Sequence, residues 1–291
     1  MHPKRGPVKN LFITSRPISW VNTAFPFAAA YFLASGTVDW VFVVGTIFFL
    51  IPYNLLMYGI NDVFDYESDL LNARKGGVEG AILDRRHHRF VLWASGISVV
   101  PFALVLATQG GVVANAVLAM SLFAVVAYSA PGLRFKERPF LDSLTSSTHF
   151  VSPAVYGLAL AQAHFTVGVW AVILAFFMWG MASHAFGAVQ DIAPDREAGI
   201  ASIATVLGAR STVWIAFSAY LLAGILMLWT AVPLAGLLVL PYLANVAPFL
   251  SITDTTSAQA NAGWKRFLWI NYLTGFLVTM TLIWLVMQAI P

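Results

Sequence analysis

Residues 38–69 read VDWVFVVGTIFFLIPYNLLMYGINDVFDYESD, an apolar run that passes directly into an acidic one. The apolar part, 38–60, reaches the length of about 20 residues that crosses the hydrocarbon core of a bilayer. Carboxylates at the end of such a segment are costly to remove from water, so their presence needs a physical reason. The stretch predicts a transmembrane helix that delivers a polar cluster, starting at Asn61, to one side of the membrane.

Composition places the whole chain in a membrane. Of its 291 residues, 59% are hydrophobic and only 10% are charged, far outside the range of soluble domains. We expect one polytopic membrane domain over residues 1–291, with a retained first helix because no small-residue cleavage signal follows the basic start. The absence of cysteine excludes disulfides, a thiolate nucleophile, a zinc–thiolate site and an iron–sulfur cluster, and it leaves the redox compartment open.

Apolar windows of about 20 residues predict the number of spans. Nine windows qualify, the fifth being the most polar: 17–36, 38–60, 90–109, 111–130, 141–162, 167–189, 211–230, 232–252 and 266–289. If the amino terminus is cytoplasmic, all 16 lysines and arginines fall on inside segments, as the positive-inside rule requires. We therefore expect an all-α integral protein of the plasma membrane with nine transmembrane helices and a cytoplasmic polar side. Because the basic residues are distributed in this way, the net charge of +3 does not indicate a nucleic-acid partner.

The first acidic run has the spacing of a binding face. Asp62, Asp65 and Asp69 stand at i, i+3 and i+7, so they share one face if the helix continues through them, and Asn61 lies four residues before Asp65. Carboxylates so close repel one another unless a cation intervenes, and Mg²⁺ takes one or two carboxylates together with waters and substrate phosphate oxygens. A solvated helix end without a ligand is the alternative.

A second acidic run strengthens the metal hypothesis. Asp191 and Asp195 stand at i and i+4 after the sixth window, and we expect Pro194 to bend or end the helix at Ala193. Four spans separate the two runs, so both lie on the cytoplasmic side, in a pattern that resembles a parallel four-helix duplication. The five aspartates are enough for about two or three Mg²⁺ ions around one diphosphate. Two unrelated loop acids are the alternative.

Basic residues near these acids suit an anionic leaving group, because arginine offers a forked donor to phosphate oxygens and lysine a point charge. The candidates for diphosphate binding are Arg74, Lys75, Arg134, Lys136 and Arg196. Positive-inside bias alone would place lysine and arginine in these connections, so each also has a purely topological interpretation.

The paired patterns N-D-x-x-D-x-x-x-D and D-x-x-x-D, on nine predicted spans, resemble the UbiA superfamily of intramembrane prenyltransferases, and the resemblance covers nearly the whole chain. It implies a helical bundle around a central cavity open to lipid, Mg²⁺-dependent ionisation of an allylic diphosphate, and transfer of the prenyl cation to an apolar acceptor. The catalytic residues implied are Asn61, Asp62, Asp65, Asp69, Asp191 and Asp195, with the five aspartates as metal ligands. Many members carry Tyr-x-x-x-Lys after the fourth span, whereas here Tyr128 precedes Lys136 at a longer spacing, so Lys136 or Arg134 is expected to hold the diphosphate.

Three further stretches resemble the lycopene elongase branch of that superfamily: residues 72–80, NARKGGVEG; residues 147–153, STHFVSP; and residues 194–199, PDREAG. Members of that branch join dimethylallyl units to the ends of lycopene and give longer carotenoids such as flavuxanthin. The resemblance implies dimethylallyl diphosphate as donor and an apolar polyene that enters from the membrane lipids as acceptor.

Polar residues inside the predicted spans are candidates for the acceptor side of the cavity, where loss of a proton or capture of water must finish the addition. These are Asn54, His149 and His184, together with Tyr128 at the end of the fourth span. A histidine in a span is costly unless it has a function or a partner, but helix–helix hydrogen bonding is an equally common role.

Other functions remain open at this stage. A quinone precursor, chlorophyllide or an archaeal ether lipid could be the acceptor within the enzyme class. A cation-coupled carrier is the second class, although carriers often show inverted repeats with ionisable groups near the midplane. A non-catalytic lipid-binding or assembly protein is the third.

Overall fold

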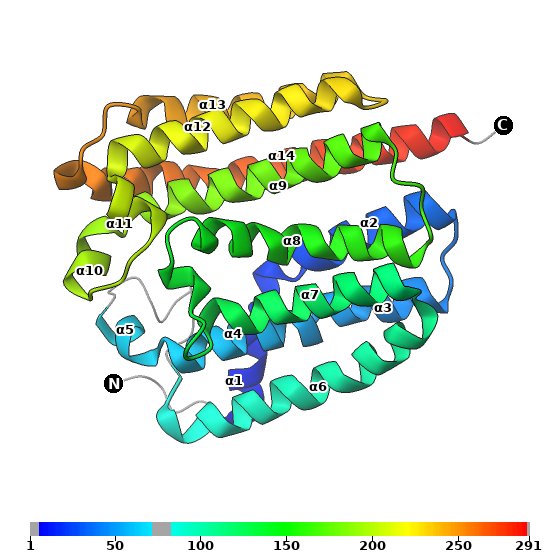
Figure 1. Ribbon diagram of the computed structural model, residues 1–291, viewed down its shortest axis with the longest axis horizontal. Coiled ribbons are helices and arrows are strands. Elements are labelled where there is room, and N and C mark those ends of the chain that lie inside the picture. Colours follow the sequence, from blue (N-terminus) through cyan, green and yellow to red (C-terminus); the bar gives the residue numbers. More distant parts are fainter. Residues whose placement is uncertain (1–5, 72–82, 290–291) are drawn as a thin grey trace. The chain divides into compact units, whose positions relative to one another are not determined.

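The computed structural model describes residues 6–71 and 83–289, and every regular element in these two ranges is a helix (Figure 1). The chain forms two compact units, which are described separately. The first comprises Met1–Phe135 and Ser152–Ala163, and the second comprises Lys136–Val151 and His164–Pro291. The all-helical fold is confirmed, while a single domain over residues 1–291 stays a prediction.

The first unit carries the first acidic run. Its elements are α1 (Pro7–Thr14), η1 (Pro17–Ser19), α2 (Val21–Ser35), α3 (Trp40–Leu50), α4 (Pro52–Phe64), α5 (Tyr66–Leu71), η2 (Arg85–His87), α6 (His88–Gln109) and α7 (Val112–Ser129). The later part of α8 (Leu141–Leu160) completes this unit, and the earlier part belongs to the second.

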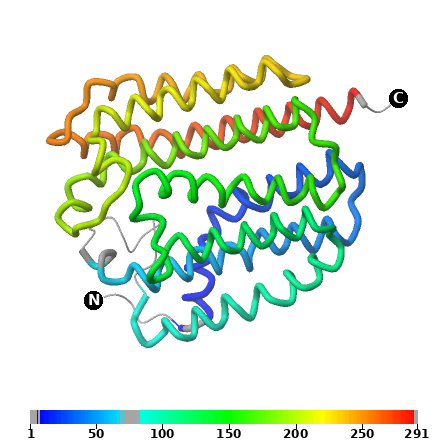
Figure 2. The backbone as a smooth tube through the Cα atoms, viewed as in Figure 1, coloured from blue at the N-terminus to red at the C-terminus, as the bar shows by residue number. Residues whose placement is uncertain are grey.

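The second unit carries the second acidic run. After η3 (Phe135–Glu137) and the start of α8, its elements are α9 (Val167–Val189), α10 (Ile192–Glu197), α11 (Ile203–Leu207), α12 (Ala209–Leu226), η4 (Met227–Trp229), η5 (Pro233–Val239), α13 (Leu240–Val246), η6 (Ala247–Phe249), η7 (Asp254–Gln259) and α14 (Ala260–Ala289). Helix α9 packs along α12 for much of its length (Figure 2).

The predicted span 38–60 is a helix with a break at Ile51. Pro52 has no N–H to donate and begins α4, so carbonyl groups of the preceding turn need other donors. The Asn54 amide donates to the carbonyl oxygens of Phe49 at 2.8 Å and Leu50 at 3.1 Å. The Thr23 hydroxyl also donates to Phe49 O at 2.7 Å. These bonds stabilise the kink and fasten it to α2.

The start of α3 is fixed by Asp39. Its carboxylate accepts the backbone N–H of Phe42 at 2.8 Å and the hydroxyl of Tyr31 at 2.9 Å. These hydrogen bonds, first of all that from Phe42, hold the pKa of Asp39 below its ordinary value. Asp39 is thus a helix cap between two apolar segments.

Six helices among the described residues are long and apolar enough to cross a membrane: Trp40–Phe64, Arg85–Gln109, Val112–Ser129, Val167–Val189, Ala209–Trp229 and Asp254–Gln288. Three predicted windows are not among them. The first contains α2, which has only 15 residues, the fifth contains the more polar α8, and the eighth is divided into the short helices of Pro233–Phe249. The protein is an integral membrane protein, and the count of nine spans is not confirmed.

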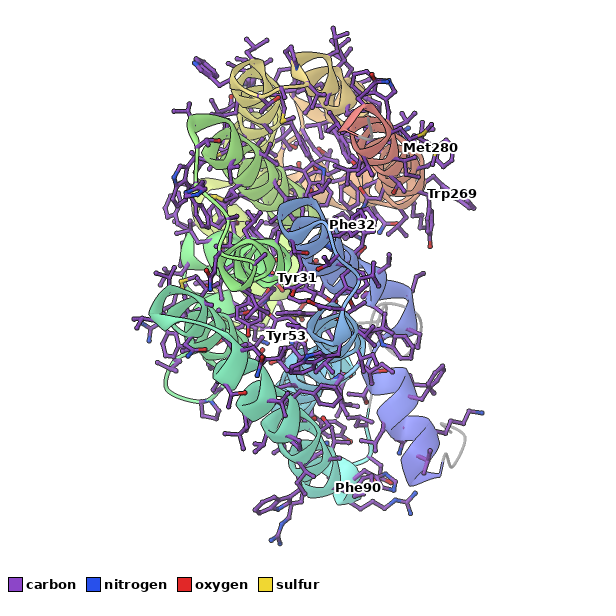
Figure 3. All side chains as sticks on the ribbon, turned by 90° about the vertical axis from the view of Figure 1, so that its right-hand side faces the viewer. Tyr31, Phe32, Tyr53, Phe90, Trp269 and Met280 are labelled. Atoms are coloured by element: carbon purple, nitrogen blue, oxygen red, sulfur yellow. The ribbon has the colours of Figure 1, made fainter. Side chains whose placement is uncertain are left out.

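Each unit has its own apolar core. Tyr53 and Phe27 are fully buried in the first, and Tyr220 and Phe186 are nearly or fully buried in the second. In Figure 3, Tyr31 and Tyr53 lie among the helices of the first unit, whereas Trp269 projects outward from α14 and is 76% exposed. Large apolar side chains that face outward are expected where a helix meets lipid.

Candidate active site

The first acidic run does not form one continuous helix. Helix α4 ends at Phe64, Asp65 adopts φ −99° and ψ 0°, and α5 begins at Tyr66. The helix does not continue unbroken through the run, which was the condition for Asp62, Asp65 and Asp69 to share one face. Asp69 lies in the six-residue α5 after the break, and the position of its side chain is outside the described part of the structure.

The second run has the same construction. Helix α9 ends at Val189, and Asp191, with φ −96° and ψ 0°, precedes the six-residue α10. The break comes before Pro194, not at Ala193 as predicted, because proline is tolerated in the first turn of the new helix. Asp195 is held in that turn by its backbone N–H, which donates to Asp191 O at 2.9 Å.

Asp65 and Asp191 are equivalent positions by backbone geometry. Each lies between a long apolar helix and a six-residue helix, and their φ and ψ values agree within 3°. Both occupy the sparsely populated region near φ −90° and ψ 0°, where many active-site residues are found. An unrelated pair of loop acids would not be expected to share this construction.

Asp62 is held by an arginine that the sequence analysis did not connect with it. The carboxylate is 1% exposed, and Oδ1 accepts from Nη2 of Arg16 at 2.7 Å. The Arg16 guanidinium also lies over the ring of Tyr58, 4.1 Å from its centre. Arg16 follows α1 in a left-handed conformation (φ 49°), which is costly for a residue other than glycine. The backbone is thus strained where it directs a cation to the acidic motif.

Asn61 and Arg134 lie beside Asp65. The Asn61 amide donates to its Oδ2, as the i, i+4 spacing predicted, and also to the Ser129 hydroxyl at 3.3 Å. Nη2 of Arg134 lies 3.8 Å from Oδ1 of Asp65. Arg134 again has a left-handed backbone (φ 42°), and it follows a turn in which Gly132 adopts φ 85°. A second strained arginine therefore faces the motif.

The remaining basic candidates lie in different places. Arg196 pairs with Asp254 at 2.7 Å and donates to Thr205 O at 2.8 Å, so it ties α10 to the rest of the second unit. Lys136 is half-buried in η3. Arg74 and Lys75 fall outside the described residues, and their role stays a prediction.

The polar candidates inside the spans are more varied. Asn54 is fully buried at the α3–α4 kink, where it stabilises the break and donates to Thr23 Oγ1 at 2.7 Å, so its contacts are structural. His149 is 3% exposed on α8, and Tyr128 is half-buried in the last turn of α7. His184 on α9 lies 3.1 Å, through Nδ1, from the Ser143 hydroxyl. Their place beside an acceptor stays a prediction.

The chemistry of the donor set fits a hard divalent cation. Asp62 and Asp65 are buried carboxylates, each beside a guanidinium, and carboxylates so far from water require positive charge. Oxygen donors of this kind are those that Mg²⁺ prefers. Within the described residues, no group of three or more His, Asp and Glu side chains is close enough to hold a metal ion.

Comparison with known proteins identifies relatives. The profile of the UbiA prenyltransferase family matches residues 23–273. The C(50) beta-cyclic carotenoids biosynthesis protein LbtBC of Dietzia sp. is 58% identical over 286 residues, which are 97% of this chain but 66% of that protein. The lycopene elongase/hydratase of Corynebacterium glutamicum is 51% identical over 278 residues, covering 95% of this chain and 97% of that protein.

Solved structures share the fold at low identity. A UbiA homologue from Archaeoglobus fulgidus, bound to DMAPP and Mg²⁺, has a TM-score of 0.66 at 16% identity and covers 91% of this chain and 98% of its own. A digeranylgeranylglyceryl phosphate synthase has a TM-score of 0.66 at 13% identity, covering 92% and 96%. These likenesses concern the fold.

Proposed function

The chain belongs to the UbiA prenyltransferase family and is a prenyltransferase, and from this premise we propose that it transfers a dimethylallyl group from its diphosphate to the ends of lycopene. The product is a longer, flavuxanthin-like carotenoid. The observation that carries the proposal to a carotenoid acceptor is 51% identity, over nearly the whole of both chains, with a lycopene elongase/hydratase. The word hydratase in the name of this relative supports a reaction that also adds water to the carotenoid.

The acidic motifs supply the diphosphate end of the site. Asp62, Asp65, Asp69, Asp191 and Asp195 would hold Mg²⁺, and Asn61 positions Asp65 through its amide. Mg²⁺ held by these residues would offset the negative charge that develops on the departing diphosphate. The equal backbone geometry of Asp65 and Asp191 supports the assignment of both runs to one task.

Arginines complete the anion site. We propose that Arg134, whose Nη2 lies 3.8 Å from Oδ1 of Asp65, donates to the leaving diphosphate, and that Arg16, which pairs with Asp62, adds a second positive charge. We retain Lys136, Arg74 and Lys75 as further donors. For Arg196, the contacts with Asp254 and Thr205 favour a positioning role.

The apolar parts of the protein suit a polyene acceptor. We propose nine spans around a central cavity that opens to lipid, with the amino terminus and the diphosphate site on the cytoplasmic side of the plasma membrane. A dry cavity shields the prenyl cation from solvent until the acceptor alkene attacks it. His149, His184 and Tyr128 are the polar groups that we place on the acceptor side.

Expression in a lycopene-accumulating bacterial host tests this function. In this host, we expect new pigments that are heavier than lycopene by one and two five-carbon units. In membranes isolated from the host, these pigments should form only when Mg²⁺ and dimethylallyl diphosphate are supplied. Asp65→Ala and Asp191→Ala should each abolish them. Asp84→Ala is the matched control, because Asp84 is exposed and pairs only locally, with Arg86 at 3.0 Å.

Three outcomes would redirect the proposal. Near-normal turnover by Asp65→Ala or Asp191→Ala, in protein that is extracted and folded, would refute the metal assignment. No new pigment from the wild type would transfer the function to a quinone precursor, chlorophyllide or ether-lipid acceptor. Movement of a labelled ion or solute into vesicles, without any prenylated product, would favour a carrier.

A further inference from the structure

Three polar residues of the second unit form a cluster that neither metal nor diphosphate binding explains. Ser143 is fully buried near the start of α8, and its hydroxyl lies 3.1 Å from Nδ1 of His184 on α9. Asp142, the residue before Ser143, is also fully buried, and its charge interacts with the imidazole of His184. Of the three, only His184 is partly exposed.

Close packing of α8 on α9 builds the cluster. A Cβ atom on Gly180 would lie 2.4 Å from Oγ of Ser147, so only glycine allows this approach. The Ser147 hydroxyl donates to Phe177 O at 2.7 Å and fastens the two helices at this crossing. One turn away on each helix, the same contact brings Ser143 opposite His184. The position of the imidazole is therefore fixed by the helix pair.

Asp142 is oriented by backbone donors. Its Oδ1 accepts the N–H of Ser143 at 2.7 Å, and its Oδ2 accepts the N–H of Ile203 at 2.7 Å. Two such bonds hold the carboxylate in one place. A fixed negative charge beside a histidine stabilises the imidazolium that forms when the ring accepts a proton.

The histidine of this cluster lies on α9, the helix that leads to the second acidic run. His184 lies on α9 five residues before this helix ends at Val189, and Asp191 follows that end by two residues, so about 10 Å separates the two at a helical rise. If a diphosphate is held at Asp191, a short prenyl chain that extends along α9 approaches His184. A partly exposed imidazole, oriented by Ser143, thus lies on the helix that leads to Asp191 and is separated from the position where the diphosphate would leave.

We propose that His184 is the general base that ends the reaction, accepting a proton from a water molecule as this water adds to the carbocation; the proposal rests on the proposed function. After the acceptor alkene has formed the new C–C bond, the positive charge lies on a carbon of the joined product. The water oxygen forms a C–O bond to this carbon, an O–H bond of the water breaks, and the proton moves to Nε2 of His184. Nδ1 donates to the Ser143 hydroxyl, and the Asp142 carboxylate balances the imidazolium. Ser143 and Asp142 are positioning residues.

The test follows the fate of water oxygen. Membranes containing the whole protein are supplied with lycopene, dimethylallyl diphosphate and Mg²⁺ in H₂¹⁸O, and elongated products are separated into alcohols and alkenes by mass. We expect ¹⁸O in the wild-type alcohol. His184→Gln should lower the ratio of alcohol to alkene by tenfold or more, and Ser143→Ala should lower it severalfold, while the total of elongated product falls much less.

Thr148→Ala is the matched control, because it removes a hydroxyl of the same helix that donates within α8, to Leu144 O at 2.8 Å, and it should leave the ratio unchanged. Elongated wild-type product without ¹⁸O, or an unchanged ratio in His184→Gln, would overturn the inference. If His184→Gln does not accumulate, an unchanged ratio in Ser143→Ala overturns it equally. Absence of any elongated product from the wild type would instead contradict the proposed function.

Discussion

Replacing Arg16 by glutamine should lower the free energy of unfolding more than the position of Arg16 near the start of the chain suggests. Asp62 is 1% exposed and takes the Arg16 guanidinium at 2.7 Å, so Arg16→Gln leaves a buried carboxylate beside a neutral side chain. Removing one member of a buried ion pair costs about 3–5 kcal/mol. The contact with the Tyr58 ring is lost as well, but the Arg16 side chain is 15% exposed and some water reaches the pair. We therefore expect a loss near the lower end, about 3 kcal/mol.

A double-mutant cycle measures the interaction energy between Arg16 and Asp62 apart from their contacts with other residues. Asp62→Asn keeps an acceptor for Arg16, so it should cost less, about 1–3 kcal/mol. The double variant should be more stable than the sum of the two single losses predicts, by at least about 1 kcal/mol, because neither charge is left beside a neutral partner. Unfolding in mixed micelles, followed by circular dichroism, measures all four proteins. Arg85→Gln, which breaks the exposed pair with Glu67, is the control and should change stability by less than about 1 kcal/mol.

Magnesium gives this cycle a second measurement that does not depend on activity. If Asp62 is a metal ligand, Mg²⁺ can replace the missing guanidinium, and it should stabilise Arg16→Gln more than the wild type. At a concentration 100 times the dissociation constant, the gain is about 2.7 kcal/mol. Additive losses in the cycle would refute the buried-pair reasoning, and an Arg16→Gln protein indifferent to Mg²⁺ would refute Asp62 as a ligand.

Three further predictions concern the frame around the site. Gly180→Ala should cost about 1–3 kcal/mol, because its Cβ would lie 2.4 Å from Ser147 Oγ, and adding Ser147→Gly should restore much of the loss in thermal unfolding. Asn54→Leu should cost at least about 1–3 kcal/mol, because carbonyls at the α3–α4 kink lose their donor, and a loss below that range in chemical unfolding would contradict this role. Asp39→Ala should cost about 1 kcal/mol at neutral pH through the lost cap on Phe42. Since the pKa of Asp39 is lowered in the fold, its contribution is present above the ordinary value of 3.8 and lost as pH falls through the folded value, so the wild type and the variant should converge in acid.

Local patterns in the sequence were enough to predict much of the fold. Apolar runs of sufficient length gave the long helices, including Trp40–Phe64 and Val167–Val189, because burial of a continuous apolar segment needs no information from distant residues. The i, i+4 contact of Asn61 with Asp65 followed from helical spacing for the same reason. Six helices qualify as spans against nine predicted windows, and the three other windows differ from them in length or polarity: α2 is short, α8 is more polar, and Pro233–Phe249 is divided into short helices.

Contacts between distant residues could not be predicted in this way. Arg16 and Asp62 are 46 residues apart, and their pairing depends on a left-handed residue after α1 that no sequence pattern marks. Asp142 escaped attention because a single acid at a helix start usually caps its own helix, whereas here it also accepts an N–H from Ile203, 61 residues away. The break at Asp65 was missed because nothing in the spacing of the aspartates distinguishes one helix from two.

The two acidic runs are equivalent in backbone but not in charge. Asp65 and Asp191 each lie at a helix break, and Asp69 and Asp195 each follow that break by four residues. Asp62 has no acidic counterpart, because the position that corresponds to it is Ala188. The extra carboxylate is also the one whose guanidinium is nearest, at 2.7 Å, compared with 3.8 Å between Asp65 and Arg134. Arg16 therefore offsets part of the charge of Asp62, so a substitution of Asp62 removes a buried ion pair as well as a proposed metal ligand. For this reason substitutions of Asp65 and Asp191, more than those of Asp62, decide whether the runs act together on one diphosphate.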